Sequence, residues 1–305
     1  MGCVSSWILC CCRGFKVAVY LSYIKTAFDR VYKDYLLAKL HSIGVADTFI
    51  DFLNSYLEPR IGRVAVEGVL SDVFELADMV FQGTVLGPSL WNVFFHDVAN
   101  EASCLGGKEQ LFADDLTVSK AYDTNITNEE IAADMTSTKK SVHAWEARNT
   151  VEFDADKEHV LILHPRHGEG ELVKLLGCTI DAKLTMSPAV DQLVARVRPK
   201  VKALLRTRGM YSHTDMTMQY KTHIWGLIAY YNGAIFHACE TVLAKLDRVQ
   251  ISFLEEIHSN DETGFLYYNF APPVLRRDIG ILGFLHKRVL GIGHPALAQF
   301  LPFSP

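Results

Sequence analysis

The first half of the chain mixes short apolar runs of strand length with stretches whose apolar residues recur every three or four positions. Residues 16–24 (KVAVYLSYI) are rich in β-branched and aromatic side chains, which predicts a strand. The spacing of Leu, Phe and Ile over 34–43 and 46–57 predicts two helices, which Gly44 separates. The chain is therefore expected to begin with strand and helix in one folded body.

Further along, the pattern predicts two hairpins with a helix between them. The first hairpin is expected over 61–66 and 73–80, because polar residues and a glycine separate two strand-like runs. Pro88 suits the first turn of a helix. That helix carries Leu90, Phe94, Phe95 and Val98 on one side. The second hairpin is expected around 112–115, where apolar residues flank two adjacent aspartates.

The rest of the pattern changes from mixed to helical. The expected elements are a helix over 127–148 capped by Thr127 or Asn128, a strand over 160–163, and a small hairpin formed by 173–180 and 183–186. From Pro188 onward the pattern is helical almost to the end. We therefore expect an α+β fold, an antiparallel sheet with packed helices followed by an all-helical subdomain. The expected domains are 1–14, outside the fold, then 15–187 and 188–305.

Composition indicates a globular protein and excludes binding of nucleic acid through overall charge. Of the 305 residues, 49% are hydrophobic, which is enough for a sizeable core. The formal net charge is −5, so contact with a polyanion requires a local basic surface.

One stretch of the helical region offers such a basic surface. Its cations are Arg196, Arg198, Lys200, Lys202, Arg206 and Arg208, with no acidic residue among them. Leu193, Val197, Val201 and Leu204 recur at helical spacing through the same stretch, so a helix would bury one side and expose the cations. The exposed side is either a phosphate-binding surface or an ordinary solvated helix face.

The cysteines argue against structural zinc and against a disulfide scaffold. The seven cysteines form no Cys-x-x-Cys pair, and their odd number, with four near the N-terminus, favours a reducing intracellular compartment, cytoplasm or nucleus. No transmembrane segment is expected, because the apolar stretch 222–239 contains polar side chains and suits a buried helix better.

The first six residues match a lipidation pattern. Gly2 is placed for N-myristoylation and Cys3 for a second acyl chain, and two chains would anchor a protein stably to a membrane. A start codon chosen inside a longer reading frame would produce the same pattern, so membrane association remains the alternative to a purely intracellular protein.

Asp114 and Asp115 are the strongest chemical feature. Two adjacent carboxylates repel each other, and a fold tolerates them where a dication neutralises them or water screens them. Because Leu111, Phe112 and Leu116 beside them are apolar and strand-forming, we expect the pair at a hairpin tip with a bound cation as its partner.

Five motifs in order together resemble the palm of a reverse transcriptase of the non-LTR retrotransposon type. Residues 27–31 (AFDRV) resemble the end of that family's first palm motif, 82–88 (QGTVLGP) its second, 112–115 (FADD) its third, 153–157 (FDADK) its fourth, and 176–179 (LGCT) its primer-grip hairpin. The resemblance covers about 15–187 and implies a palm followed by a helical thumb.

The resemblance also implies a function, an RNA-directed DNA polymerase that adds dNTPs to a primer 3′-hydroxyl on an RNA template by two-metal phosphoryl transfer. Asp114 and Asp115 would hold two Mg²⁺ ions, for which Mn²⁺ can substitute, and Lys157 would be a proton donor to the leaving group. The residues implied to line nucleotide and template are Phe28, Gln82 and Gly83. The basic helix would follow the nucleic-acid backbone.

The sequence departs from this family at the first motif. Tyr23 stands where the family has a metal-binding aspartate, and a neutral phenol is a poor Mg²⁺ ligand. The family's long fingers region before this motif is also not present in these 305 residues. We therefore expect an impaired polymerase. The alternatives are a non-catalytic nucleic-acid-binding remnant of a retroelement and an N-acylated membrane-associated protein.

Overall fold

The computed structural model describes residues 2–292. The chain divides into two compact units, Phe15–Ile162 and a second unit that combines Met1–Gly14 with Leu163–Pro305. The residues that match the first four palm motifs belong to the first unit, and the primer-grip motif at 176–179 and the basic helix belong to the second.

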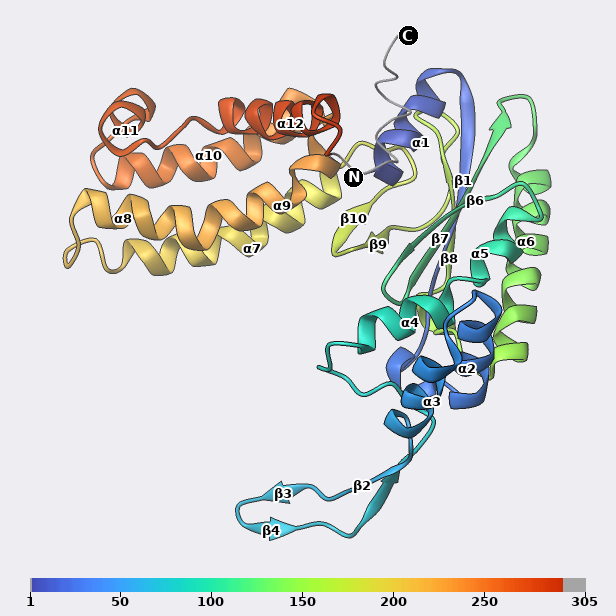
Figure 1. Ribbon diagram of the computed structural model, residues 1–305. Coiled ribbons are helices and arrows are strands. Elements are labelled where there is room, and N and C mark those ends of the chain that lie inside the picture. Colours follow the sequence, from blue (N-terminus) through green and yellow to red (C-terminus); the bar gives the residue numbers. More distant parts are fainter. Residues whose placement is uncertain (1, 293–305) are drawn as a thin grey trace. The chain divides into compact units, whose positions relative to one another are not determined.

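A four-stranded sheet forms the centre of the first unit (Figure 1). Its strand order is β6 (Lys108–Phe112), β7 (Asp115–Asp123), β1 (Phe15–Tyr23) and β8 (His159–Leu163). β7 pairs antiparallel with both β6 and β1. Because β1 is an inner strand with partners on either side, its residues from Lys16 to Ser22 are all buried, as its nearly continuous apolar run requires.

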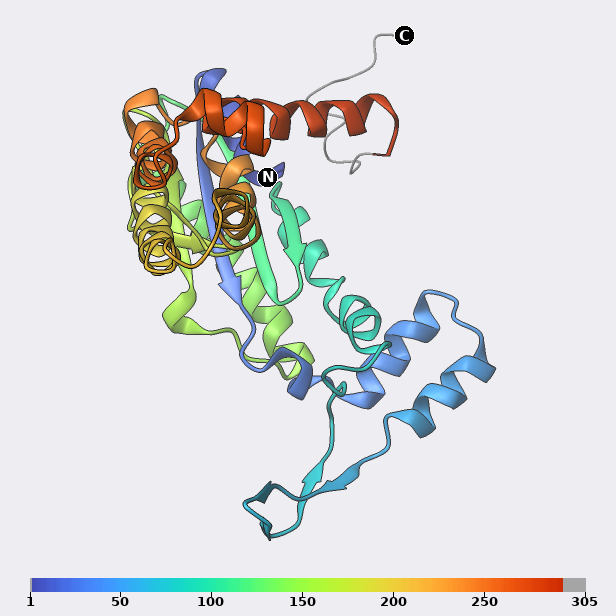
Figure 2. The same cartoon turned by 90° about the vertical axis from the view of Figure 1, so that its left-hand side faces the viewer.

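Helices cover this sheet and complete the core. They are η1 (Ala27–Arg30), α2 (Lys33–Ser42), α3 (Asp47–Tyr56), α4 (Gly87–Phe95), α5 (Val98–Ser103), α6 (Asn128–Asn149) and the short η2 (Ala155–Lys157). The capping box predicted for α6 is present, with Thr127 and Glu130 bonded reciprocally. Figure 2 shows α6 running along the sheet. Trp91, Phe94, Phe95 and Trp145 pack edge to face or stacked between these helices.

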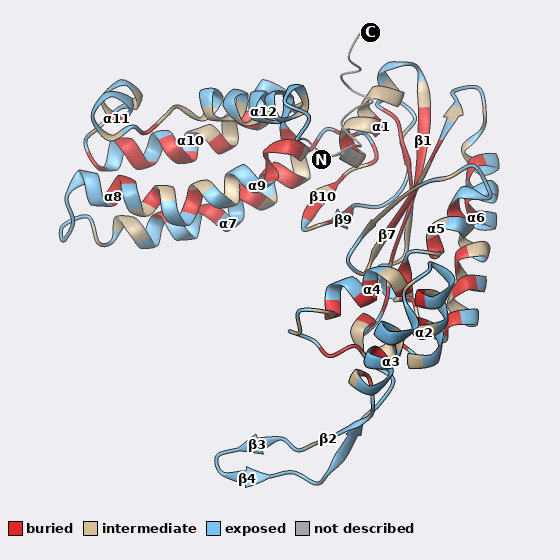
Figure 3. Cartoon of the chain, in the orientation of Figure 1, coloured by how far each residue is buried: buried red, intermediate tan, exposed pale blue. Residues whose placement is uncertain are grey.

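The first predicted hairpin forms, but few of its side chains pack against the rest of the unit. β2 (Arg60–Gly62) pairs with β5 (Phe74–Leu76), and β3 (Ala65–Val66) pairs with β4 (Val69–Leu70). Nearly all of this hairpin is exposed, including Ile61 at 77% and Val69 at 72% (Figure 3). The strand expected to continue to residue 80 ends at Leu76, because nothing pairs with the chain beyond that point in the described structure.

The second unit is mainly helical, and Pro188 begins a helix as predicted. Its elements are α1 (Gly2–Cys12), β9 (Val173–Leu175), β10 (Cys178–Ile180), α7 (Ser187–Leu205), α8 (His213–Tyr220), the π-helical η3 (Lys221–Trp225), α9 (Gly226–Ile235), α10 (Glu240–Glu256), α11 (Asp261–Tyr268) and α12 (Pro273–Val289). Pro188 lies in the first turn of α7, and Pro273 in that of α12.

The α+β fold class is confirmed, and three local expectations are corrected. Residues 183–186 form no strand, because the hairpin closes earlier through Leu176 and Gly177, both at positive φ. Val98 begins a separate helix instead of extending α4. The segment 1–14 does not lie outside the fold, because α1 buries Val4 and Trp7, each 3% exposed. The boundary near residue 187 stays a prediction, as does acylation of Gly2 and Cys3.

No helix among residues 2–292 is long and apolar enough to cross a membrane. The stretch 222–239 instead forms part of η3 and α9, with Asn232 buried.

Candidate active site

The Asp114–Asp115 pair lies where the second hairpin meets the end of β1. Phe112 pairs with Asp115 across the β6–β7 turn, and Asp115 in turn pairs with Tyr23 of β1. Since directly opposite residues of an antiparallel pair share one face of the sheet, the Tyr23 and Asp115 side chains are neighbours. The backbone N–H of Ile24 also donates to the Asp114 carbonyl at 3.4 Å. The expected hairpin tip is therefore confirmed, although Phe112 beside it is 64% exposed.

A buried indole fixes the turn that carries the pair. Ala113 adopts a left-handed conformation, with φ of 55°. The Trp91 Nε1–H donates to the Ala113 carbonyl at 2.8 Å. Trp91 is only 1% exposed, so its ring is held on all sides by the core. The hydrogen bond from Trp91 therefore fixes the strained turn at Ala113, and with it the positions of the two carboxylates.

Asp114, Asp115 and Tyr23 form a corner of the sheet whose electrostatics favour a bound cation. Burial, followed by the charge of Asp114, raises the pKa of Asp115 to about 6, and the ammonium of Lys157 opposes that rise. Burial and the charges of Asp115 and Asp114 raise the pKa of Tyr23 to about 12. Tyr23 is therefore a neutral phenol at neutral pH, whereas the two carboxylates carry charge that the protein compensates only in part.

Lys157 lies beside the same corner. Its segment is attached to the end of β1, because the Asp154 N–H donates to the Tyr23 carbonyl at 2.8 Å and Ile24 forms a bridge with Phe153. The Lys157 Nζ lies 3.2 Å from the Asp154 Oδ2 and 5.6 Å from the centroid of the Tyr23 ring. The fold therefore brings together Tyr23, Asp115 and Lys157, which are far apart in sequence.

A buried network behind the sheet holds the segment that carries Lys157. The Glu158 side chain, 4% exposed, accepts from the Tyr20 hydroxyl and lies 2.5 Å from the Lys139 Nζ. His143 bridges Glu158, at 2.8 Å from Nε2 to Oε1, and Glu146. Glu146 also accepts the Phe153 N–H at 2.6 Å. Strand β1, helix α6 and the Lys157 segment are thus joined through polar side chains.

Phe28 contacts Trp91, and Gln82 and Gly83 lie near the short helix η1 that carries Phe28. The Phe28 ring stacks on Trp91, with centroids 5.8 Å apart, and its carbonyl accepts the Val80 N–H at 2.8 Å. The Gln82 Nε2 lies 3.4 Å from the Asp29 Oδ1, and Gly83 has φ of 77°. The region of the second palm motif is therefore tied to η1. The roles predicted for Phe28, Gln82 and Gly83 stay predictions.

The basic helix has the two-sided character predicted from its sequence. Leu193, Val197 and Val201 of α7 are buried, and all six cations are exposed, four of them within α7 and Arg206 and Arg208 just after its end. Arg196 donates to the Tyr231 hydroxyl at 3.0 Å, and Arg208 lies 3.9 Å from Glu256. The other four, Arg198, Lys200, Lys202 and Arg206, have no acidic partner within residues 2–292.

The donor set fits a divalent cation only in part. Asp114 and Asp115 provide the hard, charged oxygens that Mg²⁺ prefers, and their mutual repulsion gives a reason to bind one. Within the described residues, however, no group of three or more His, Cys, Asp or Glu side chains could hold a metal ion. The phenol of Tyr23 takes the place of a third carboxylate opposite Asp115.

Sequence reasoning missed the residues that position this site. Trp91 looked like one more apolar residue of a helix, and nothing along the chain indicated its bond to Ala113. Glu158 and His143 were likewise unremarkable as single charges.

Comparison with known proteins identifies the class of protein that this fold and this corner of carboxylates define. The chain belongs to the reverse transcriptase (RNA-dependent DNA polymerase) family, whose model matches residues 20–180. This range contains every palm residue discussed above. The resemblance predicted from the five motifs is therefore confirmed.

Two similar curated proteins come from mobile elements of Drosophila melanogaster. The chain is 28% identical over 256 residues to a probable RNA-directed DNA polymerase from transposon X-element, covering 74% of this chain and 26% of that protein. It is 29% identical over 207 residues to the RNA-directed DNA polymerase from mobile element jockey, covering 62% and 22%. The chain thus spans about a quarter of the length of these relatives.

Among solved structures, the chain is similar to apo telomerase from Candida tropicalis. The TM-score is 0.42 with 11% sequence identity, and the match covers 94% of this chain and 52% of the telomerase chain.

Proposed function

We propose that this chain is the polymerase domain of a retroelement, which extends a DNA primer with dNTPs along an RNA template. The observation that carries the proposal is the corner formed by Asp114, Asp115 and Lys157 within a region that matches the reverse transcriptase family. The names of the Drosophila relatives support the same activity.

Each residue of the corner has a proposed task. Asp114 and Asp115 would hold Mg²⁺ or Mn²⁺, which when bound offsets the negative charge that builds up at a reacting phosphate. Lys157 would donate a proton to the departing pyrophosphate, and its exposed ammonium is free to move toward a ligand. Phe28 would limit the space at the sugar 2′ position, and Gln82 and Gly83 would line nucleotide and template.

The activity of this chain should be low because Tyr23 replaces a carboxylate. Its phenol stays protonated at neutral pH and donates no charge to a metal ion. Groups that act as a unit in catalysis lose several powers of ten in rate when one is removed. We therefore infer an impaired two-carboxylate site in an otherwise intact palm.

Primer extension on an RNA template tests this proposal directly. The variant Tyr23→Asp should extend a primer at least ~10²-fold faster than the parent in Mg²⁺ or Mn²⁺, because it restores a third charged oxygen opposite Asp115. Adding Asp114→Asn to that variant should abolish the gain. The conservative variant Tyr23→Phe, which adds no carboxylate, is the matched control and should not gain activity. Equal extension by all three proteins and the parent would exclude the catalytic assignment.

The exposed cations of α7 favour a second candidate, nucleic-acid binding without catalysis. Arg198, Lys202 and Arg206 are four residues apart and therefore follow one face of the helix, opposite its buried side. Such a row of cations can contact successive phosphates of a nucleic-acid backbone.

Charge reversal distinguishes this candidate from a solvated helix face. Changing Arg198, Lys202 and Arg206 to Glu should weaken RNA–DNA duplex binding about tenfold or more and reduce its dependence on salt. The control changes Arg166, Lys183 and Arg248 to Glu, three exposed cations outside α7 with the same total charge change. If both triple variants bind equally well, α7 is not the contact surface.

A further inference from the structure

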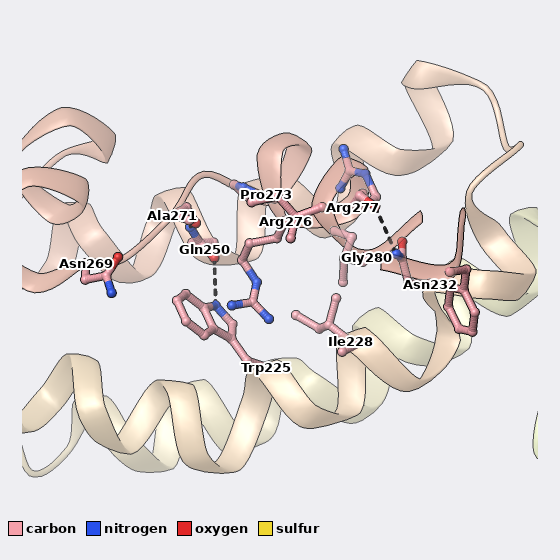
Figure 4. A pocket seen from close by; sticks show the side chains of 14 residues that line it. Trp225, Ile228, Asn232, Gln250, Asn269, Ala271, Pro273, Arg276, Arg277 and Gly280 are labelled. Atoms are coloured by element: carbon pink, nitrogen blue, oxygen red, sulfur yellow. Dashed lines mark hydrogen bonds between the residues drawn. The ribbon is translucent and has the colours of Figure 1, made fainter. Parts of the chain in front are cut away.

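The helical unit contains a cavity of about 460 Å³ between α9, α10 and α12 (Figure 4). This volume is in the range of sites for small organic ligands. Most of its wall is apolar, formed by Ile228, Ala229, Leu246, Ile279 and Phe284. No carboxylate lines it within the described residues, although two arginines do.

One wall of the cavity is an indole held rigidly in place. Trp225 ends the π-helical segment η3, and such segments occur frequently at functional sites. Its Nε1–H donates to the Gln250 Oε1 at 3.1 Å, and the Gln250 Nε2 donates to the Ala271 carbonyl at 3.0 Å. Gln250 is 2% exposed, so both side chains are fixed by the surrounding core (Figure 4).

Arg276 lies on the face of this indole, with its Cζ 3.4 Å from the ring centroid. Its neighbour Arg277 forms a two-bond ion pair with Asp247, in which Nη2 lies 2.9 Å from Oδ2. Arg276 has no acidic partner within residues 2–292. Burial lowers the pKa of Arg276 to about 10, so its guanidinium remains charged at neutral pH.

Two further features of the cavity point to an external ligand. Arg276 belongs to the first turn of the 17-residue helix α12, and this first turn contains no acidic residue to complement the positive end of the helix dipole. Asn232 also lines the cavity and is 7% exposed, and its Oδ1 has no hydrogen-bond donor among the described residues. An unpaired cation and an unused buried acceptor therefore border the same space.

We propose that this cavity binds an amphipathic organic anion, a carboxylate carried on an aromatic or aliphatic body. The guanidinium of Arg276 lies over the face of Trp225, and its planar fork of N–H groups matches the two oxygens of a carboxylate. The body of the ligand would replace water along Ile228, Leu246 and Ile279. This site is independent of the polymerase corner and does not rest on the proposed function.

Calorimetric titration of the full chain with two isosteric probes tests the charge. Naphthalene-2-carboxylate should bind at one saturable site, about tenfold or more tighter than uncharged naphthalene-2-carboxamide, because a charge-assisted hydrogen bond is stronger than a neutral one. In Arg276→Gln this difference should disappear, whereas the exposed control Arg248→Gln on α10 should retain it. Inorganic phosphate alone should bind weakly, since it has no apolar body.

Two outcomes would overturn the proposal. One is equal affinity of the parent for the carboxylate and the carboxamide, and the other is the absence of saturable binding. If Arg276→Gln disturbs folding, as judged by circular dichroism, Ala229→Trp provides a second test from the opposite wall. Ala229 is exposed at the cavity, so this substitution should fill the space, keep the helical spectrum and abolish carboxylate binding. Undiminished binding by Ala229→Trp would place the ligand elsewhere.

Discussion

Strand β1 carries two tyrosines, each beside a carboxylate, and the two pairs have opposite electrostatic character. Tyr20 donates to Glu158 within a buried network. Burial opposes ionisation of Glu158, yet hydrogen bonds from Lys139 and Tyr20 and the charge of His143 lower its pKa overall. Asp115, opposite Tyr23, has a raised pKa of about 6. The same strand thus borders Glu158, whose charge is compensated by neighbouring cations, and Asp115, whose charge is not fully compensated.

This difference separates a structural carboxylate from the one that we propose binds a metal ion. Around Glu158 the protein supplies its own cations and donors, so no ligand is needed. Around Asp115, the charge of Asp114 adds repulsion. The ammonium of Lys157 opposes this repulsion only in part, and it belongs to an exposed side chain. Uncompensated charge at a partly buried corner is costly for folding and useful for binding a cation.

The largest effect on stability is expected from Glu158→Gln. Loss of this carboxylate leaves Lys139 and His143 without their shared partner, and the free energy of unfolding should fall by about 2–3 kcal/mol at pH 7. Because the folded pKa of Glu158 is lowered, its contribution is present above the ordinary glutamate pKa and is lost as the pH falls through the lowered value. Urea unfolding of the parent and the variant at several pH values measures the loss of stability at pH 7 and its pH dependence.

The control for this substitution is Asp156→Asn, two residues away on the same segment. Asp156 is exposed, so its removal should change the free energy of unfolding by less than about 0.5 kcal/mol. If Glu158→Gln is equally harmless, the network does not hold the Lys157 segment.

The opposite sign is expected for Asp115→Asn. Removing the charge relieves the repulsion with Asp114 and the burial of a carboxylate, so the metal-free protein should gain about 1–2 kcal/mol in free energy of unfolding at pH 7. Because the folded pKa is raised, the parent should lose stability as the pH rises from about 4 to about 6. The variant should lack this part of the pH profile. A loss of stability in the variant at neutral pH would contradict the assignment.

The smallest expected effect is stabilisation by a divalent cation. At an Mg²⁺ concentration ten times its dissociation constant, binding to Asp114 and Asp115 should raise the free energy of unfolding by about 1.4 kcal/mol. Thermal unfolding with and without Mg²⁺ measures this shift, which should vanish in Asp115→Asn. The effect should also weaken below about pH 6, as Asp115 becomes protonated. An equal shift in Glu158→Gln and the parent would show that the two carboxylate sites act separately.

Local pattern was enough to predict most elements and the family. The apolar run of β1, the Thr127 capping box of α6 and the prolines that begin α7 and α12 all lie where their sequences indicate. These features depend on residues within one or two turns of each other, so a linear pattern contains them. The hairpin over 60–76 was also visible in the sequence, but its exposure was not.

The palm ancestry, the adjacent carboxylates and the lack of an acidic residue at position 23 can all be read along the chain. The folded structure was needed to learn that Tyr23 pairs with Asp115, that Trp91 anchors the turn at Ala113, and that Lys157 lies beside Tyr23. It also decided that Arg276 is left unpaired beside a cavity, whereas Arg277 is not. The physical reason is that burial and charge compensation depend on residues distant in the chain, which only folding brings into contact.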